Sequence, residues 1–272
     1  MLIDTHCHVN IMVKEKFDTP LNEKNFEEAT KIAEEANQAG VNHIINVGTS
    51  VIESLNCINL AQRNDHMYAA IGIHPSDCTQ TWQQELKEIE KLIEDKTDNK
   101  IVAIGECGID LHHQQHNLES QKELFKAQIE LSLKHKLPLS IHMRDATETV
   151  FSVLEAYAKE DLKGVIHCFS EDQKFADYVI KLGFVIGIGG AITYPNNGRL
   201  RSVVSNIPLK KIILETDAPY LPPQVIRGKE NHPKHIADIA KYIANLKKQS
   251  FGFVAEITTN TAFEVFKLSD FA

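Results

Sequence analysis

The chain has 272 residues and a formal net charge of −8 at pH 7. This length suits one α/β barrel, a fold that typically needs about 250 residues. We therefore expect a single domain over residues 1–272. The negative charge argues against a protein that attracts nucleic acid through a strongly basic surface. A polyanionic substrate would need bound cations or a local basic loop to offset the repulsion.

The five cysteines are an odd number without Cys-x-x-Cys spacing, which indicates reduced thiols and argues against a zinc ribbon. The N-terminal segment has no basic stretch followed by a long apolar one, and no apolar run approaches the ~18 residues of a membrane span. The sequence therefore predicts a cytoplasmic protein without a membrane-spanning segment. Nothing in it implies an obligate protein partner.

Short β-branched runs alternate with longer amphipathic segments along the chain, which is typical of βα units around a parallel sheet. Eight runs are predicted to be strands: Met1–Val9, His43–Gly48, Met67–His74, Ile101–Cys107, Pro138–Arg144, Gly164–Phe169, Phe184–Gly190 and Ile212–Pro219. Eight such units predict a TIM (β/α)8 barrel.

The segments between the strands carry helical signals. Asn25–Gly40 ends at a glycine, as helices often do, and Asn117–Lys136 carries apolar residues at steps of three and four. After the last strand, a proline-rich polar stretch predicts a long loop. Pro233–Lys248 and Phe251–Leu268 are predicted to be the last two helices.

Ligand-type side chains fall at the C-terminal ends of the predicted strands: His6, His8, His74, Glu106, His142, His167 and Asp217. In a TIM barrel these ends converge on the face that carries the active site. We therefore expect a metal site at this face.

His6 and His8 lie on the same side of a strand, because side chains alternate with a period of two. This pair alone fits two solvated histidines as well as two ligands of one cation, which would stabilise both as neutral imidazoles. Likewise, His142 or His167 alone would more often be a buried, hydrogen-bonded histidine than a ligand. The expected convergence of all these groups favours the metal site.

Four carboxylates are expected to have different roles. Glu106 has two oxygens that can bridge two cations, although a strand-end carboxylate paired with a base is an alternative. Asp217 ends an apolar strand where desolvation is costly without a cation, and we expect it to act as ligand and as general base toward water. Glu215 is expected to orient a ligand histidine or to form a structural ion pair. Asp4 lies deeper and is expected to be structural.

The sequence resembles the TatD family of metal-dependent deoxyribonucleases, within the amidohydrolase-like TIM barrels. The resemblance rests on six segments in this order: Asp4-Thr-His-Cys-His8, Gly72-Ile-His-Pro75, Gly105-Glu-Cys-Gly-Ile-Asp110, Ile141-His-Met-Arg144, His167-Cys-Phe-Ser170 and Leu214-Glu-Thr-Asp-Ala-Pro-Tyr-Leu221. Each segment alone is a weak pattern, but six in order at predicted strand ends form a specific one.

The resemblance implies a site with two divalent cations. His6, His8 and Asp217 would hold one cation and His142 and His167 the other, with Glu106 between them. His74 and Arg144 would meet a phosphate oxygen, and Arg227 and Asn231 match a polar loop beside the substrate. Asp217, Glu106 and His74 would then form the catalytic set.

The implied reaction is hydrolysis of phosphodiester bonds in single-stranded DNA, as a 3′ to 5′ exonuclease in which the cations activate water. Mg²⁺ would be the usual cofactor, while imidazole and carboxylate ligands suit Zn²⁺, Mn²⁺ or Fe as well. One alternative is an esterase, lactonase or aminoacyl-ester hydrolase of the amidohydrolase type, in which a lysine often stands where Glu106 does. A second is a barrel that binds metal or nucleic acid without catalysis.

Three positions depart from the family pattern. His232 stands between Asn231 and Pro233 where a glutamate is usual, and Leu111-His-His113 replaces expected aromatic residues. Glu171 stands in place of a glycine. These departures leave the proposed ligands intact and bear on substrate preference.

Overall fold

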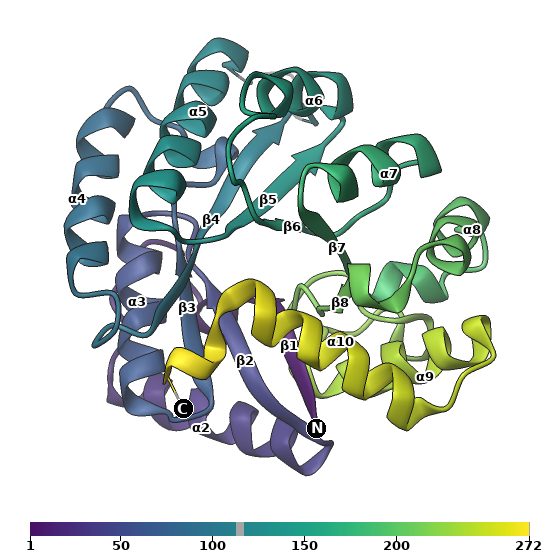
Figure 1. The fold of residues 1–272 in the computed structure, drawn as a ribbon. Helices are drawn as coiled ribbons and strands as arrows, with labels where there is room; N and C mark the ends of the chain where they lie inside the picture. The colour runs from purple at the N-terminus through teal and green to yellow at the C-terminus, as the bar shows by residue number, and fades with distance from the viewer. Residues whose placement is uncertain (113–116, 272) are drawn as a thin grey trace.

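The computed structural model describes residues 1–112 and 117–271, so His113 and His116 lie outside the described residues. Its eight parallel strands are neighbours in chain order: β1 (Leu2–Cys7), β2 (Val41–Val47), β3 (Met67–Ile71), β4 (Ile101–Asp110), β5 (Leu139–Arg144), β6 (Gly164–Ile166), β7 (Phe184–Ile188) and β8 (Ile212–Leu214). The strands form a nearly closed barrel inside a ring of helices (Figure 1), and the predicted TIM barrel is confirmed.

The helices follow the strands in alternation. They are α1 (Val9–Met12), α2 (Glu23–Gln38), α3 (Val51–Arg63), α4 (Trp82–Glu94), α5 (Leu118–His135), α6 (Thr147–Ala156), α7 (Gln173–Lys181), α8 (Gly198–Asn206), α9 (Ile236–Lys247) and α10 (Phe251–Phe266). Short 3₁₀ helices are η1 (Pro75–Asp77), η2 (Gly190–Thr193), η3 (Leu209–Lys211), η4 (Gln224–Ile226), η5 (Pro233–His235) and η6 (Leu268–Phe271). None of the helices in the described part of the chain is both long and apolar enough to cross a membrane.

Most strand boundaries differ from the predicted ones. The predicted strand Ile212–Pro219 ends at Leu214, because the chain then turns from β7 toward β1. Glu215 N still donates to the Ile188 carbonyl of β7 at 3.3 Å, whereas Asp217 N donates to the His6 carbonyl of β1 at 2.9 Å. The predicted strand Ile101–Cys107 continues to Asp110, because Gly108 lets β4 stay close to β5. A Cβ at Gly108, whose φ is +134°, would come within 2.0 Å of the His142 carbonyl oxygen.

The barrel interior is a packed apolar core that α10 closes at one end. Ile3, Ile45 and Val47 from the first two strands share a buried cluster with Ala262 and Phe266 of α10. This helix crosses the barrel at the end where the strands begin (Figure 1), and Thr259 Oγ1 donates to the Met1 carbonyl at 3.3 Å. The C-terminal ends of the strands are therefore the end available for a site.

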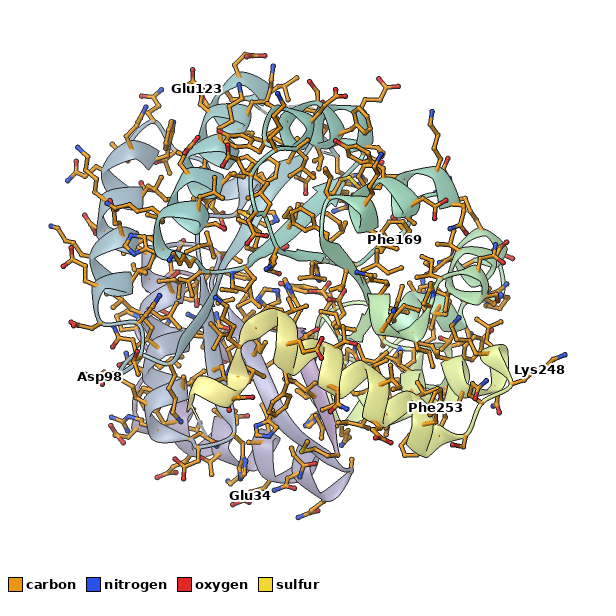
Figure 2. The ribbon with its side chains drawn as sticks, viewed as in Figure 1. Glu34, Asp98, Glu123, Phe169, Lys248 and Phe253 are labelled. Carbon is orange, nitrogen blue, oxygen red and sulfur yellow. The ribbon has the colours of Figure 1, made fainter. Side chains whose placement is uncertain are left out.

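Charged side chains occupy the periphery of the molecule. Glu34, Asp98, Glu123 and Lys248 are exposed and point away from the barrel, whereas Phe169 is buried within it (Figure 2). This distribution is the usual one for a helix-covered barrel, in which the outer helix faces meet water.

The seam between β1 and β8 depends on side chains as much as on backbone. Asp4 is fully buried and accepts hydrogen bonds from the backbone N–H of Thr216 at 2.9 Å and from the Thr216 hydroxyl. Thr5 Oγ1 donates to the Leu214 carbonyl at 2.9 Å. Beyond the end of β8, Asp217 N donates to His6 O at 2.9 Å, so the seam sets Asp217 directly beside β1.

We predict that Asp4→Ala lowers the free energy of unfolding by about 2 kcal/mol or more, because it leaves the buried Thr216 N–H without its acceptor. Denaturant titration followed by circular dichroism measures the change. The matched control is Asp98→Ala, on the exposed surface, which should stay within about 0.5 kcal/mol of the parent. Equal unfolding midpoints for Asp4→Ala and the parent would show that the seam does not depend on this carboxyl group.

Candidate metal centre

Six side chains from five strands meet at the open end of the barrel. His6 and Glu106 are buried in β1 and β4, and His142 lies in β5. His8, His167 and Asp217 each come just after a strand ends. The ligand atoms of two sets lie within 4.8 Å of one another: one set is His6, His8 and Glu106, and the other is Glu106, His142 and His167. The sets overlap at Glu106, the residue that was predicted to bridge.

The two oxygens of Glu106 face different histidines. Oε2 lies 3.5 Å from His6 Nε2 and 3.7 Å from His8 Nε2. Oε1 lies 2.7 Å from His142 Nδ1 and 3.9 Å from His167 Nε2. One carboxylate therefore serves both halves of the cluster, with one oxygen turned toward each.

Asp217 completes the half of the cluster that contains His6 and His8. Its Oδ1 lies 3.4 Å from His8 Nε2, 3.6 Å from His167 Nε2 and 3.9 Å from His6 Nε2. The backbone of Asp217 has a φ of +58°, and Cys168, which follows His167, has a φ of +50°. Left-handed conformations of residues other than glycine are uncommon and tend to occur at functional sites.

Outer hydrogen bonds orient the ligand histidines. His8 Nδ1 lies 2.9 Å from the carbonyl oxygen of Val47, which requires the proton to be on Nδ1 and leaves the Nε2 lone pair facing the cluster. His6 Nδ1 pairs with the Ser140 hydroxyl at 3.1 Å, and its buried Nε2 has no hydrogen-bond partner within the described residues. Metal ligands are commonly held in this way, through the ring nitrogen that does not face the ion.

Glu215 orients His167 from beneath. Its Oε1 lies 3.1 Å from His167 Nδ1, and the carboxylate also accepts a hydrogen bond from the backbone N–H of Cys168. Gly187 of β7 makes room for it, since a Cβ there would come within 2.2 Å of Glu215 Oε2. This contact fits both roles expected of Glu215, the orientation of a proposed ligand histidine and a structural ion pair.

His74 has the opposite orientation. Its Nδ1 accepts the backbone N–H of Ser76 at 3.1 Å, so the neutral ring carries its proton on Nε2. That Nε2 lies 3.7 Å from Glu106 Oε1, and burial lowers the pKa of His74 to about 4. His74 therefore presents an N–H donor, which suits a substrate oxygen better than a cation.

Asp110 is a site residue that the sequence reasoning missed as a functional group. It is 5% exposed, and its Oδ2 lies 3.1 Å from His142 Nε2, so His142 is held between Asp110 and Glu106. Asp110 lies four residues after Glu106, on the same face of the strand. Extending the predicted strand beyond Cys107, with side chains alternating between its two faces, would have identified it.

The charges of the cluster stabilise one another. Burial alone raises the pKa of Glu106, but the neighbouring histidines outweigh it and hold that pKa well below its usual value. Burial lowers the pKa of His167, but Glu215 and Asp217 outweigh it and raise it to about 10. In the same way, the carboxylates of Asp110 and Glu106 raise the pKa of His142 to about 9. Cations and protons compete for such ligand atoms, so the donors suit divalent cations.

The cluster fits divalent cations on three grounds. The buried His6 Nε2 lacks a hydrogen-bond partner within the described residues, Nε2 of His8 faces the same space, and carboxylate oxygens face both atoms. Imidazole and carboxylate donors together suit Zn²⁺, Mn²⁺ or Fe, and carboxylates suit Mg²⁺. The arrangement supports several metal-binding sets and leaves the number and identity of the ions open.

Two predicted substrate residues, Arg144 and Arg227, are exposed, whereas His74 lies beside Glu106. Arg144 is exposed at the end of β5, in register with Asp110. The exposed Arg227 stacks its guanidinium on the Tyr194 ring, 4.0 Å from the centroid. Arg144 thus carries a positive charge next to Asp110, and Arg227 carries one on the loop that follows β8.

Asn231 does not fit the predicted role of a substrate contact. It is 1% exposed, and its Nδ2 donates to the carbonyl oxygens of Thr216 and Tyr220, both at 2.8 Å. Its backbone N–H donates to the Pro219 carbonyl at 2.9 Å. Because the amide is occupied by the loop itself, Asn231 shapes the loop that carries Tyr220.

Two of the departures from the family pattern can be placed. His232 turns toward α2, where its Nε2 lies 3.5 Å from Glu35 Oε2, so its side chain belongs to a helix contact. In the segment 111–113, Leu111 packs against the core and His112 Nδ1 lies 3.0 Å from Asp145 Oδ2. His113 lies outside the described residues.

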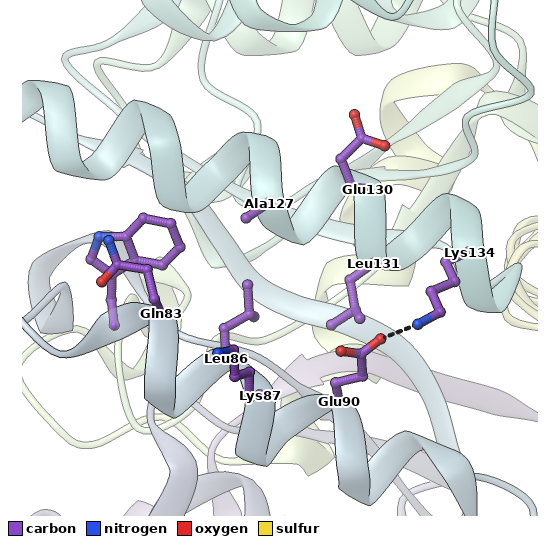
Figure 3. A pocket seen from close by; sticks show the side chains of 9 residues that line it. Gln83, Leu86, Lys87, Glu90, Ala127, Glu130, Leu131 and Lys134 are labelled. Atoms are coloured by element: carbon purple, nitrogen blue, oxygen red, sulfur yellow. Dashed lines mark hydrogen bonds and ion pairs between the residues drawn. The ribbon is translucent and has the colours of Figure 1, made fainter.

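A groove on the outside of the barrel has a different character. It lies between α4 and α5, has a volume of 270 Å³ and is floored by Leu86, Ala127 and Leu131 (Figure 3). At its edge, Lys134 Nζ and Glu90 Oε1 form an ion pair at 2.6 Å. This pair joins two of the charges along the groove, whereas the charges of the central cluster converge on one space.

A family model described as TatD related DNase matches residues 3–267. The chain belongs to the TatD family. It is 36% identical to an uncharacterized metal-dependent hydrolase, YabD, of Bacillus subtilis (strain 168), over 99% of this chain and 100% of that protein. It is 31% identical to the 3'-5' ssDNA/RNA exonuclease TatD of Edwardsiella piscicida, over 88% of this chain and 93% of that protein.

A solved structure of a TatD homologue agrees with this assignment. YjjV of Escherichia coli K12 superposes with a TM-score of 0.87 at 30% identity, covering 98% of each chain. As a member of this family, the chain is a metal-dependent hydrolase, and the resemblance inferred from six short segments is confirmed over nearly the whole length.

We predict that Glu106→Gln loses at least half of the bound metal, because an amide cannot offer an anionic oxygen to both halves of the cluster. The parent should melt at a higher temperature when Mn²⁺ or Zn²⁺ is added, since a ligand that binds only the folded state stabilises it. The variant should show little of this increase. Elemental analysis and thermal melts measure both effects.

The control is Glu35→Gln, an exposed carboxylate on α2, which should bind as much metal as the parent. Full metal content in Glu106→Gln would remove this residue from the centre of the site.

Proposed function

We propose that the protein hydrolyses phosphodiester bonds and acts as a 3′ to 5′ exonuclease on single-stranded DNA, with two divalent cations. The observation that carries the proposal is Glu106, whose two oxygens each face a separate set of histidines. His6, His8 and Asp217 would hold one cation and His142 and His167 the other, with Glu106 shared. The name of the Edwardsiella relative supports a nucleic-acid substrate.

When bound, a pair of divalent cations supplies Lewis acidity that activates water and neutralises charge on a phosphate. The surrounding residues would accept the proton of the attacking water and bind the phosphate. Asp217 is ionised, because the neighbouring histidines outweigh burial and lower its pKa. Its carboxylate faces the shared centre of the cluster and can accept the proton of the attacking water.

His74, Arg144 and Arg227 would bind the phosphate. His74 offers the Nε2–H that its bond with Ser76 fixes in place, within 3.7 Å of Glu106. A non-bridging phosphate oxygen is a good acceptor for such a donor. Arg144 and Arg227 would add positive charge, because a protein with a net charge of −8 would otherwise repel an anionic strand.

We expect the protein to release mononucleotides from single-stranded DNA labelled within the chain, in the presence of Mg²⁺ or Mn²⁺. Asp217→Asn should lower the turnover number by about 100-fold or more, because the amide cannot accept a proton. Asp98→Asn, on the exposed surface, should match the parent. Circular dichroism would verify that each variant is folded.

Strands blocked at the 3′ or the 5′ end establish the direction of digestion. A protein that leaves DNA intact with every cation tested but turns over a lactone or an aminoacyl ester would contradict the nuclease. Unchanged hydrolysis by Asp217→Asn would remove Asp217 from the mechanism.

A further inference from the structure

Tyr220 is an aromatic residue that lies beside the metal centre and remains open to solvent. Its ring centroid lies 6.1 Å from that of His8, with the two ring planes at 69°, and the residue is 45% exposed. This edge-to-face contact with His8 covers part of the Tyr220 ring. The exposed part lies at the opening of the site, next to a proposed ligand.

The backbone of Tyr220 is fixed on both sides. Its N–H donates to the Asp217 carbonyl at 2.7 Å, and its own carbonyl accepts Nδ2 of Asn231 at 2.8 Å. Asn231 is buried and also bonds to Thr216, so the residue that holds Tyr220 is anchored to the β1–β8 seam. The ring is therefore presented from a rigid base, and ordering it against a ligand costs little conformational entropy.

A planar apolar surface at this place suits one part of a nucleic acid. A phosphodiester held at the cluster carries a base one sugar away, and every base offers a flat face for stacking. A small aliphatic ester or lactone has no flat group to place there. Aromatic side chains that stack on bases bind single strands with little preference for sequence.

We propose that Tyr220 is the stacking platform for the base of the terminal nucleotide, and that the site therefore requires an unpaired base without distinguishing which one. This inference rests on the proposed nuclease function and adds the residue that recognises the substrate. A base in a duplex is covered on both faces by its neighbours, so a frayed or single-stranded end would be selected.

The first experiment measures KM and kcat on two single-stranded oligonucleotides, one ending in a normal nucleotide and one ending in an abasic nucleotide. Tyr220→Ala should raise KM for the normal strand by roughly 5- to 100-fold, the range expected for the loss of one base–aromatic stack. KM for the abasic strand should change little. Tyr220→Phe should resemble the parent on both strands, because the ring and not the hydroxyl does the stacking.

Phe253 provides a matched control. It is also an aromatic residue that is 45% exposed, but it lies on α10, the helix that closes the opposite end of the barrel (Figure 2). Phe253→Ala should leave both KM values unchanged. The metal content of Tyr220→Ala, measured by elemental analysis, should equal that of the parent, which separates base stacking from support of His8.

A second experiment does not depend on turnover. The natural chain has one tryptophan, Trp82, which is 9% exposed, so Tyr220→Trp adds a reporter at the proposed platform over a constant background. With strands whose linkages are made resistant to cleavage by phosphorothioate substitution, the normal strand should quench the new fluorescence and the abasic strand should not.

The outcomes separate this inference from the proposed function. An active parent with unchanged KM in Tyr220→Ala and no quenching in Tyr220→Trp would overturn the platform and leave the nuclease standing. Loss of metal in Tyr220→Ala would also overturn it and make Tyr220 a support for His8. If the parent cuts no DNA, the nuclease fails, and the fluorescence experiment still decides whether position 220 contacts a base.

Discussion

The closure of the barrel between its first and last strands is the constraint on which the metal centre depends. β8 is short, and the chain beyond it is held by the buried Asp4 carboxyl group and by the backbone of β1. These bonds bring Asp217 next to His6, although the two residues are more than 200 positions apart in the sequence. Asp4, a buried carboxyl group outside the proposed ligand set, thus helps to bring Asp217 beside His6.

Within the cluster, the outer hydrogen bond of each imidazole decides what its inner nitrogen can do. His8 places its proton on the nitrogen that faces the Val47 carbonyl, so a lone pair faces the centre. His74 accepts the Ser76 N–H, so a donor faces the centre instead. The same type of side chain can therefore offer a lone pair at one strand end and an N–H donor at another, and the neighbouring backbone makes the difference.

The sequence was sufficient to predict the barrel and the convergence of the ligand-type residues, because both follow from strand order and from the shared direction of parallel strands. It was less informative where geometry depends on a single residue. Gly108 extends β4 to Asp110, and that extension could not be read from apolar runs. Asn231 looked like a polar substrate contact, but its amide is occupied by loop carbonyls, and only coordinates reveal such pairing. The sequence does not identify Tyr220 as an exposed aromatic residue, since the exposure of a side chain depends on the fold.

The loop after β8 is closed at its base, because the Asn231 N–H bonds to Pro219 and its side chain bonds to Thr216 and Tyr220. Between these anchors, η4 and the segment through Glu230 are largely exposed. The stretch is thus an exposed loop with a fixed base. Its outer part can vary in length and charge while the hydrogen bonds at its base, beside the cluster, stay unchanged. Related barrels could diversify their choice of substrate there at little risk to folding, and a protein engineer could graft new tips at the same two anchor points.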